Sequence, residues 1–294
     1  MTELTKNTKI LIVGLGVIGG GYAKALTAEG YVHVRCITKN QADVDYALAN
    51  GMIEYGTTEL DETLIKDSEL IIFALYPTAF KEWIEKNQKL FAPGTIITDV
   101  SGVKSGIVKP IQDILRSDVE FISSHPMAGR EKSGVEYSTA EVFKGANYIV
   151  VPTEKNTQNA INVCKLLGQA LGFANISILT IEEHDKMIAF LSQLTHCIAV
   201  TLMNSNNEGN LEKYTGDSFR DLTRIAKIND LMWSELFILN REALIDEMNA
   251  FIKTFTEFRD MIKSSDVDSM RSEMRRASAK RELFDKPTEN RNKS

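Results

Sequence analysis

Cysteine is scarce in this sequence, and a surplus of basic residues is missing altogether. Only three cysteines occur among 294 residues; Cys36, Cys164 and Cys197 lie within apolar runs and form no CxxC pair. We therefore expect small buried side chains in a reducing compartment, with no disulfide and no metal site. Acidic residues outnumber basic ones by 40 to 34, giving a net charge of −6. Because nucleic-acid binders carry a basic face, no nucleic-acid partner is expected.

The sequence also lacks a secretion signal and internal repeats. Its start has no basic segment followed by an apolar stretch and a cleavage site, so secretion is not expected. The uncharged run 187–207 has the length of a membrane span. Ser192, Gln193 and His196 make this run too polar for lipid. We expect it to be a helix buried in protein, and we expect a cytoplasmic chain with no membrane association.

The order of the apolar patterns predicts two domains. From residue 8 to about residue 180, short β-branched runs alternate with amphipathic stretches, which predicts an α/β fold with a Rossmann-type doubly wound parallel sheet. After residue 181 only helical spacing continues. We therefore expect a dinucleotide-binding domain at residues 1–180 and an all-α substrate-binding and dimerisation domain at 181–294. The predicted strands are residues 9–16, 33–38, 69–75, 95–100, 120–124, 147–151 and 175–179, and the predicted helices are residues 22–30, 41–51, 78–90, 157–172, 182–204, 219–226, 230–264 and 267–283.

A glycine motif follows the first predicted strand. Gly14, Gly16 and Gly19 form GxGxxG at the start of a predicted helix. In that context the glycines permit a tight turn, a close backbone approach to a pyrophosphate and close helix packing. The motif predicts dinucleotide binding; the alternative is a purely structural glycine turn.

The end of the second predicted strand bears on the choice of cofactor. NAD-preferring sites usually carry an acidic residue there for the ribose 2′-hydroxyl, whereas this chain has Thr38 and Lys39. A hydroxyl and an ammonium group suit a 2′-phosphate, so we expect NAD or NADP with a preference for NADP. Asp43 could still supply the missing carboxylate, and Lys39 could be merely solvated.

Histidine is rare, with four in the chain, and two of the four are candidate site residues. His125 follows the fifth predicted strand, where doubly wound sheets place residues that contact ligands. His196 lies four residues after Ser192, on one face of a predicted apolar helix, where a lone histidine is more often a core residue than a site residue. Further along, Arg220, Arg224 and Lys227 are spaced to share a helical face that could bind carboxylates.

Seen together, the motifs resemble a known family. GLGVIGG, TDVSGVKS, SSHPMAGREKSG, EEHDK, LSQLTH and FRDLTRIA, followed by Trp233, are similar to the motifs of prephenate dehydrogenases in order and spacing. The resemblance extends over about residues 8 to 285. It implies oxidative decarboxylation of prephenate to 4-hydroxyphenylpyruvate in tyrosine biosynthesis.

The resemblance also implies residue roles. His125 matches the histidine that takes the proton of the substrate's ring hydroxyl as hydride leaves for the nicotinamide. Arg224 matches an arginine that holds the substrate carboxylate. Ser192 and His196 match positions that line the pocket, and Glu131 matches an acidic residue near its mouth.

One motif departs from the family pattern. Family members often have Gly-Ser in this loop, with the serine bonding the catalytic histidine, whereas this chain has Ser101 and then Gly102. We expect Ser101 to supply the hydroxyl from an altered backbone path; the alternative is a turn residue.

Other residues of the resemblance are expected to be structural. We expect His184 and Asp185 to join the domains or cap a helix, and Trp233 to belong to the core or to a subunit contact. The apolar stretch 230–264 predicts a homodimer through the helical domain. The chain leaves no room for a chorismate mutase extension or an ACT-type domain, so any inhibition is expected at the active site.

Three alternatives stay open. The substrate could be arogenate, the amino analogue of prephenate, because the discriminating contact is not legible. Another two-domain dehydrogenase of the β-hydroxyacid type would share the glycine loop, but its GxxGxGxxxKxxN-like helix motif is missing here. A regulator that senses NAD(P) without chemistry is the third.

Overall fold

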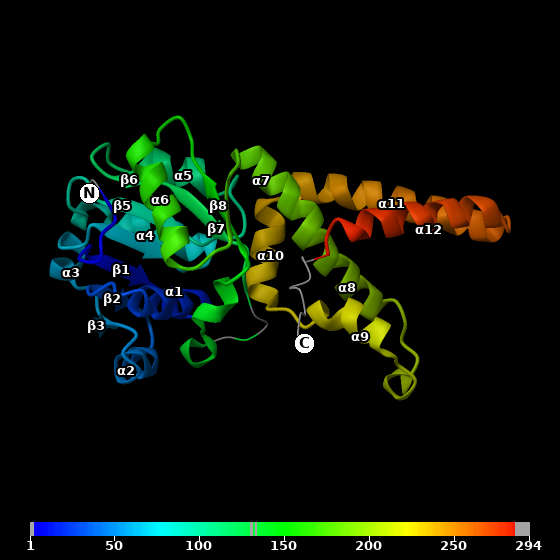
Figure 1. Cartoon of the computed structure of the whole chain (residues 1–294), viewed down its shortest axis with the longest axis horizontal. Helices are drawn as coiled ribbons and strands as arrows, with labels where there is room; N and C mark the ends of the chain where they lie inside the picture. Colours follow the sequence, from blue (N-terminus) through cyan, green and yellow to red (C-terminus); the bar gives the residue numbers. More distant parts are fainter. Residues whose placement is uncertain (1–2, 130–131, 133, 286–294) are drawn as a thin grey trace, which may run out of the picture. The chain divides into compact units, whose positions relative to one another are not determined.

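A six-stranded parallel sheet forms the centre of the N-terminal part of the chain (Figure 1). The computed structural model describes residues 3–129, 132 and 134–285. The strand order is β3-β2-β1-β4-β5-β6, which is the Rossmann order, and the predicted fold class is confirmed. The strands are β1 (Ile10–Val13), β2 (Val34–Ile37), β3 (Tyr55–Thr57), β4 (Leu70–Phe73), β5 (Ile96–Asp99) and β6 (Glu120–Phe121).

Helices pack on both faces of this sheet because successive residues of β1 point to opposite sides. Ile10 and Ile12 belong to one buried cluster, and Leu11 and Val13 belong to another. The helices of this part are α1 (Val17–Ala28), α2 (Gln41–Ala49), α3 (Glu62–Lys66), α4 (Pro77–Asn87), η1 (Gln88–Leu90), α5 (Val108–Ile114) and α6 (Gln158–Ala170). Strand β3 and helices α3 and α5 had no prediction, since each is too short to show a clear period.

A second sheet of three strands was not predicted. It consists of β7 (Ser123–Pro126), β8 (Asn147–Val151) and β9 (Asn175–Ile178), and β7 pairs antiparallel with β8. The run 120–124 was expected to be one strand of a single parallel sheet, and this is wrong. The run divides at Ile122 because the next two residues, Ser123 and Ser124, bond to Asp99 and lead the chain toward β8. The 3-10 turns η2 (Val135–Tyr137) and η3 (Ala140–Phe143) lie between β7 and β8.

The C-terminal part is helical, as predicted. Its elements are α7 (Ile181–Ile188), η4 (Ala189–Leu194), α8 (Thr195–Asn204), η5 (Leu211–Lys213), α9 (Asp217–Thr223), η6 (Arg224–Ala226), α10 (Asp230–Leu239), α11 (Arg241–Lys263) and α12 (Val267–Glu282). The chain forms two compact units, residues 1–244 and 245–294. The predicted domain boundary at residue 180 is a different division and stays a prediction.

The stretch Ile181–Asn204 is, by length and composition, apolar enough to cross a membrane, with a mean hydropathy of 1.4 over its most apolar window. Only 28% of that window is buried within the chain, so the expectation of a buried helix is wrong for most of it. Its polar side chains His184, Asp185 and Gln193 are nevertheless buried, and they bond to the sheet part and to α10.

A buried ion pair joins the two sheets at the end of β5. Lys104 and Asp99 have fully buried side chains, and Lys104 Nζ lies 3.1 Å from Asp99 Oδ2. Lys104 Nζ also donates to the Ser124 carbonyl oxygen at 2.7 Å. Asp99 Oδ1 accepts from Ser123 Oγ and from the Ser124 backbone N–H. These bonds fix the start of β7, which carries His125.

Replacing the lysine should therefore destabilise the fold. We expect Lys104→Met to lower the free energy of unfolding by about 3 kcal/mol or more, because it leaves the Asp99 carboxylate buried without a cation. Urea unfolding measures the change, with Lys109→Met, on the exposed side of α5, as the matched control. A change below about 0.5 kcal/mol, the range of an ordinary surface substitution, would contradict this role.

Candidate active site

The glycine loop has the geometry of a phosphate cradle. Gly14 has φ +95°, and a Cβ placed there would lie 2.6 Å from the Ala74 carbonyl oxygen. A Cβ at Gly19 would overlap the Gly14 carbonyl oxygen, whereas one at Gly16 meets nothing within 4 Å. Gly16 is the N-cap of α1 and provides no side-chain cap. The helix N-terminus thus presents its N–H groups to open space, which fits a pyrophosphate.

Thr38 and Lys39 lie beside this loop, at the end of β2. Thr38 is half-buried, and its Oγ1 accepts from the Leu15 backbone N–H at 3.3 Å. Lys39 is exposed. Asp43 accepts a hydrogen bond from the Asn40 side chain at 3.1 Å. This single bond leaves the Asp43 carboxylate with further acceptor sites, so the choice between NAD and NADP stays a prediction.

His125 is the first member of a chain of hydrogen bonds. Its Nδ1 lies 2.9 Å from Nε2 of His184, and Nδ1 of His184 lies 2.7 Å from Oδ1 of Asp185. His184 and Asp185 are buried, and His125 is half-buried. Burial lowers the pKa of His125 well below its usual value, and the nearby charges of His184 and Lys104 lower it further. His125 is therefore a neutral base over most of the pH range.

The carboxylate at the far end of this chain stays ionised. Burial alone would raise the pKa of Asp185, but hydrogen bonds from His184 and from Ser105 outweigh it and leave the pKa lowered. The backbone N–H groups of Lys104 and Ser105 donate to Asp185 at 2.9 and 2.6 Å, and the Ser105 hydroxyl donates as well. Asp185 thereby ties helix α7 to the loop after β5.

The expected bond from Ser101 to His125 is not made. The Ser101 hydroxyl is buried and has no hydrogen-bond partner among the described residues. A Cβ on Gly102 would lie 3.8 Å from Nε2 of His125. The position that faces the ring is therefore 102, and at this position the chain has no side chain. The Ser-Gly order places the hydroxyl one residue too early for this bond.

The second candidate histidine, His196, packs against the ring of Trp233. Its ring lies over Trp233, with centroids 3.7 Å apart, and its Nδ1 bonds to the Ser192 carbonyl oxygen at 2.8 Å. Residues 189–194 are a π-helical turn, and such turns are frequent at functional sites. His196 and Ser192 do lie together, but the contact uses the Ser192 backbone. Trp233, expected in the core or a subunit contact, lies against a predicted site residue.

Two predicted site residues remain, Arg224 and Glu131, and the structure describes only Arg224. Arg224 begins the 3-10 turn η6, which packs against α8, and its side chain is exposed. The predicted shared face with Arg220 and Lys227 is wrong, because helix α9 ends at Thr223 and Arg220 pairs with Asp217. Glu131 lies outside the described residues.

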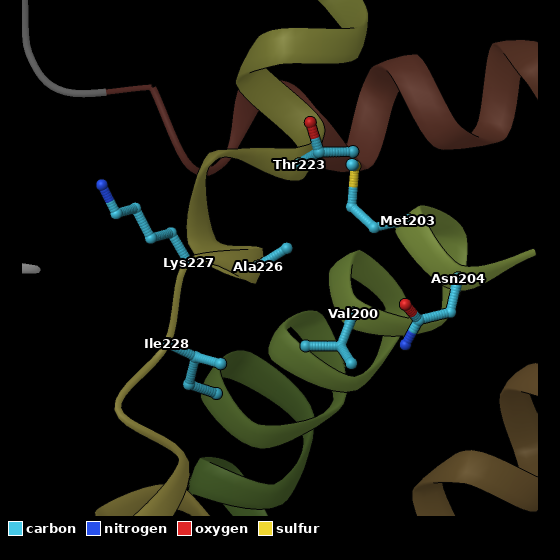
Figure 2. Close-up of a pocket in the computed structure, with 7 residues that line it drawn as sticks. All are labelled: Val200, Met203, Asn204, Thr223, Ala226, Lys227 and Ile228. Carbon is cyan, nitrogen blue, oxygen red and sulfur yellow. The ribbon is translucent and has the colours of Figure 1, made fainter. Parts of the chain in front are cut away.

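An open depression of about 470 Å³ lies between α8 and residues 223–228. Val200, Met203, Asn204, Thr223, Ala226, Lys227 and Ile228 line it, and the Lys227 side chain points away from the others (Figure 2). Lys227, one of the three basic residues expected to bind carboxylates, is among them, whereas His125, His196 and Arg224 are not. Among the described residues, no group of three or more His, Cys, Asp or Glu side chains could hold a metal ion.

His184 was not predicted to be the direct partner of His125. A capping box was available as a signal: Thr180 and Glu183 cap α7 reciprocally, and the pattern T-x-x-E precedes His184. The capping box fixes where helix α7 begins, but no local pattern reveals that the face carrying His184 meets β7. The buried Lys104 was equally invisible, since an isolated lysine in a loop predicts exposure.

A Rossmann-order sheet, a glycine cradle at the switch between β1 and β4, and a buried base define a dinucleotide-dependent dehydrogenase. Residues 22–173 match the model of the family "Prephenate dehydrogenase, nucleotide-binding domain", and residues 180–276 match "Prephenate dehydrogenase, dimerization domain". The chain belongs to the prephenate dehydrogenase family and is an oxidoreductase.

Individual relatives agree with this assignment. The chain is 27% identical to the prephenate dehydrogenase of Bacillus subtilis, over 89% of this chain and 72% of that protein. It is 27% identical to the cyclohexadienyl dehydrogenase of Zymomonas mobilis, over 88% and 90%. The structure of prephenate dehydrogenase from Aquifex aeolicus, in complex with hydroxyphenyl propionate and NAD+, superposes with a TM-score of 0.87 and 28% identity, over 96% of this chain and 99% of that one.

Proposed function

We propose that the chain catalyses the NAD(P)-dependent oxidative decarboxylation of prephenate to 4-hydroxyphenylpyruvate, a step of tyrosine biosynthesis. The observation that carries this proposal is the placement of His125. Its Nδ1 is bonded to His184, and its Nε2 faces the backbone of Gly102, where a side chain is missing. A neutral imidazole nitrogen that no side chain at position 102 covers suits a general base for a substrate hydroxyl.

His125 takes the proton from the ring hydroxyl through Nε2. A bound nicotinamide would supply the acceptor for the hydride that leaves the carbon bearing this hydroxyl. Loss of carbon dioxide then makes the ring aromatic, which drives the reaction forward. The glycine loop and the N-terminus of α1 would hold the pyrophosphate. Leu236 of α10 lies near Gly102 and Leu239 lies against Gly106, so apolar side chains border the loop that faces His125.

We assign substrate carboxylate binding to Arg224, with Ser192 and His196 lining the same pocket. The support is local: η6, which begins with Arg224, packs against α8, which carries His196. A planar guanidinium suits a carboxylate better than a mobile ammonium group does. Ser101 remains a candidate for a polar contact with a bound ligand, because its buried hydroxyl has no partner among the described residues.

Kinetics with the intact enzyme test the function and the cofactor preference. Thr38 and Lys39 replace the acid that an NAD site usually carries, so we expect a higher kcat/KM with NADP than with NAD. The rise in absorbance at 340 nm is measured with prephenate and with arogenate, and with each cofactor. A larger kcat/KM with arogenate than with prephenate would show that arogenate is the preferred substrate. Cofactor binding without reduction on either substrate would contradict dehydrogenase activity and favour a sensor.

His125→Asn should lower kcat by about 10² to 10⁴-fold, because it removes the general base, and it should leave cofactor affinity nearly unchanged. In the wild type the acid limb of kcat/KM should lie below pH 6.5, since the pKa of His125 is lowered and the rate falls only when pH drops through that lowered value. Stopped assays across pH 4.5 to 9 give both quantities. Normal turnover in the variant would remove His125 from the mechanism.

We also propose that the chain acts as a homodimer. Large apolar side chains are exposed on the C-terminal helices, including Phe190, Leu231 and Ile238 in the first unit and Phe255 in the second. Such surface is unusual for a monomer, and the second matching family model is a dimerization domain. Light scattering should give twice the chain mass of 32.9 kDa; a monomer at micromolar concentration would contradict the dimer.

A further inference from the structure

We propose that His184 and Asp185 are positioning residues for His125, forming a two-histidine relay that fixes the basic nitrogen and takes up its positive charge during turnover. This inference deepens the proposed function and rests on it. It replaces the expectation that both residues only join domains or cap a helix. In this chain His125 is held by a hydrogen bond at its Nδ1, because the hydroxyl of Ser101 does not bond to the ring.

One anion sets the direction of every hydrogen bond in the relay. An ionised carboxylate only accepts hydrogen bonds, so Nδ1 of His184 must carry the hydrogen that is shared with Asp185 at 2.7 Å. Neutral His184 then has its lone pair on Nε2, which must accept from Nδ1 of His125 at 2.9 Å. His125 is thereby held as the Nδ1–H tautomer, with its lone pair on Nε2, the nitrogen that faces Gly102.

The two histidines can also take up the proton that the substrate hydroxyl releases. When the hydroxyl O–H bond breaks, the proton forms a bond to Nε2 of His125. The Nδ1 hydrogen of His125 can then pass to Nε2 of His184, which leaves His125 neutral and His184 as the imidazolium beside the Asp185 carboxylate. The hydride goes to the nicotinamide, so the two electrons and the proton are accounted for.

The charged groups around the rings favour this outcome. Asp185 faces the pair from α7, Asp99 from the end of β5 and Lys104 from the following loop, while α10 contributes the apolar Leu236 near Gly102. With both carboxylates ionised and Lys104 charged, this buried group has one uncompensated negative charge before turnover, and a proton on the histidine pair neutralises it. Burial lowers the pKa of His184, and the hydrogen bond with Asp185 opposes that effect.

The tautomers can be tested without substrate. Long-range ¹H–¹⁵N NMR spectra of the histidine rings distinguish protonated from unprotonated ring nitrogens, and His125→Asn and His184→Gln assign the signals. The relay requires Nδ1 to be protonated and Nε2 unprotonated in both rings at neutral pH. An Nε2-protonated His125 would overturn the proposal, whether or not the protein turns over prephenate.

Kinetics of variants test the role in turnover. We expect His184→Leu to lower kcat by about 10²-fold or more, since the tautomer of the base is no longer fixed, with little change in the KM for cofactor. The amide of His184→Gln can accept from His125 and donate to Asp185, so this variant should recover to within about tenfold of the wild type. His33→Gln is the matched control, because His33 bonds to Glu54 at the far side of the sheet.

Asp185→Asn tests the relay through the pH dependence of kcat/KM, which would not shift if Asp185 had only a structural role. Removing a nearby anion lowers the pKa of the histidine pair, so the acid limb of kcat/KM should shift to lower pH by about one unit, with a reduced plateau. Wild-type turnover in His184→Leu, or an unchanged acid limb in Asp185→Asn, would overturn the relay. An inactive wild type whose rings show the expected tautomers would instead contradict the proposed function and leave the hydrogen-bond relay standing.

Discussion

The site depends on a balance of buried charge beneath His125. Asp99 and Lys104 neutralise each other with no exposed side-chain surface, and Asp185 is held by two backbone N–H groups of the loop that contains Lys104. Each carboxylate joins two elements: Asp99 joins β5 to β7, and Asp185 joins α7 to the loop after β5. Because an unpaired buried charge is costly, these elements cannot separate without a penalty. The position of His125 is therefore set by electrostatics as much as by the sheet.

The hydrophobic pattern of the sequence predicted those elements of the fold that depend on a single local requirement, such as burial of an apolar strand or a turn that needs glycine. The apolar run Ile10–Val13 predicted a central strand, and the glycine motif after it predicted a tight turn; the structure has both. The division at Ile122 was not predictable, because the pattern of residues 120–124 is compatible with one strand. It depends on Asp99, twenty or more residues away in the chain, and such a contact leaves no local signal.

The same distinction applies to the site. His125 was found because it follows a strand at the ligand-binding edge of the sheet, and the resemblance to a family supported the assignment. His184 was judged structural, since nothing within EEHDK shows that helix α7 turns this ring toward β7. The proposed role of Ser101 was transferred from the family across a reversed dipeptide. A hydroxyl reaches its partner only from one backbone position, so residue type without position was insufficient.

The π-helical turn changes the relative direction of two histidines on one helical stretch, His184 and the proposed pocket residue His196. An α-helix turns about 100° per residue, so the twelve steps from His184 to His196 would place the two side chains about 120° apart. A π-turn absorbs one additional residue, since its bonds run from i to i+5, and eleven effective steps leave an angle of about 20°. The turn at residues 189–194 thus brings both rings toward one side of the helix. The Ser192 carbonyl oxygen accepts from the Thr195 backbone N–H, from the Thr195 hydroxyl and from His196. Asn240 bonds to both the Asp185 carbonyl oxygen and the Gln193 side chain. A regular helix with the same sequence would direct His184 and His196 to faces about 120° apart, so the irregular turn sets the relative direction of the two rings.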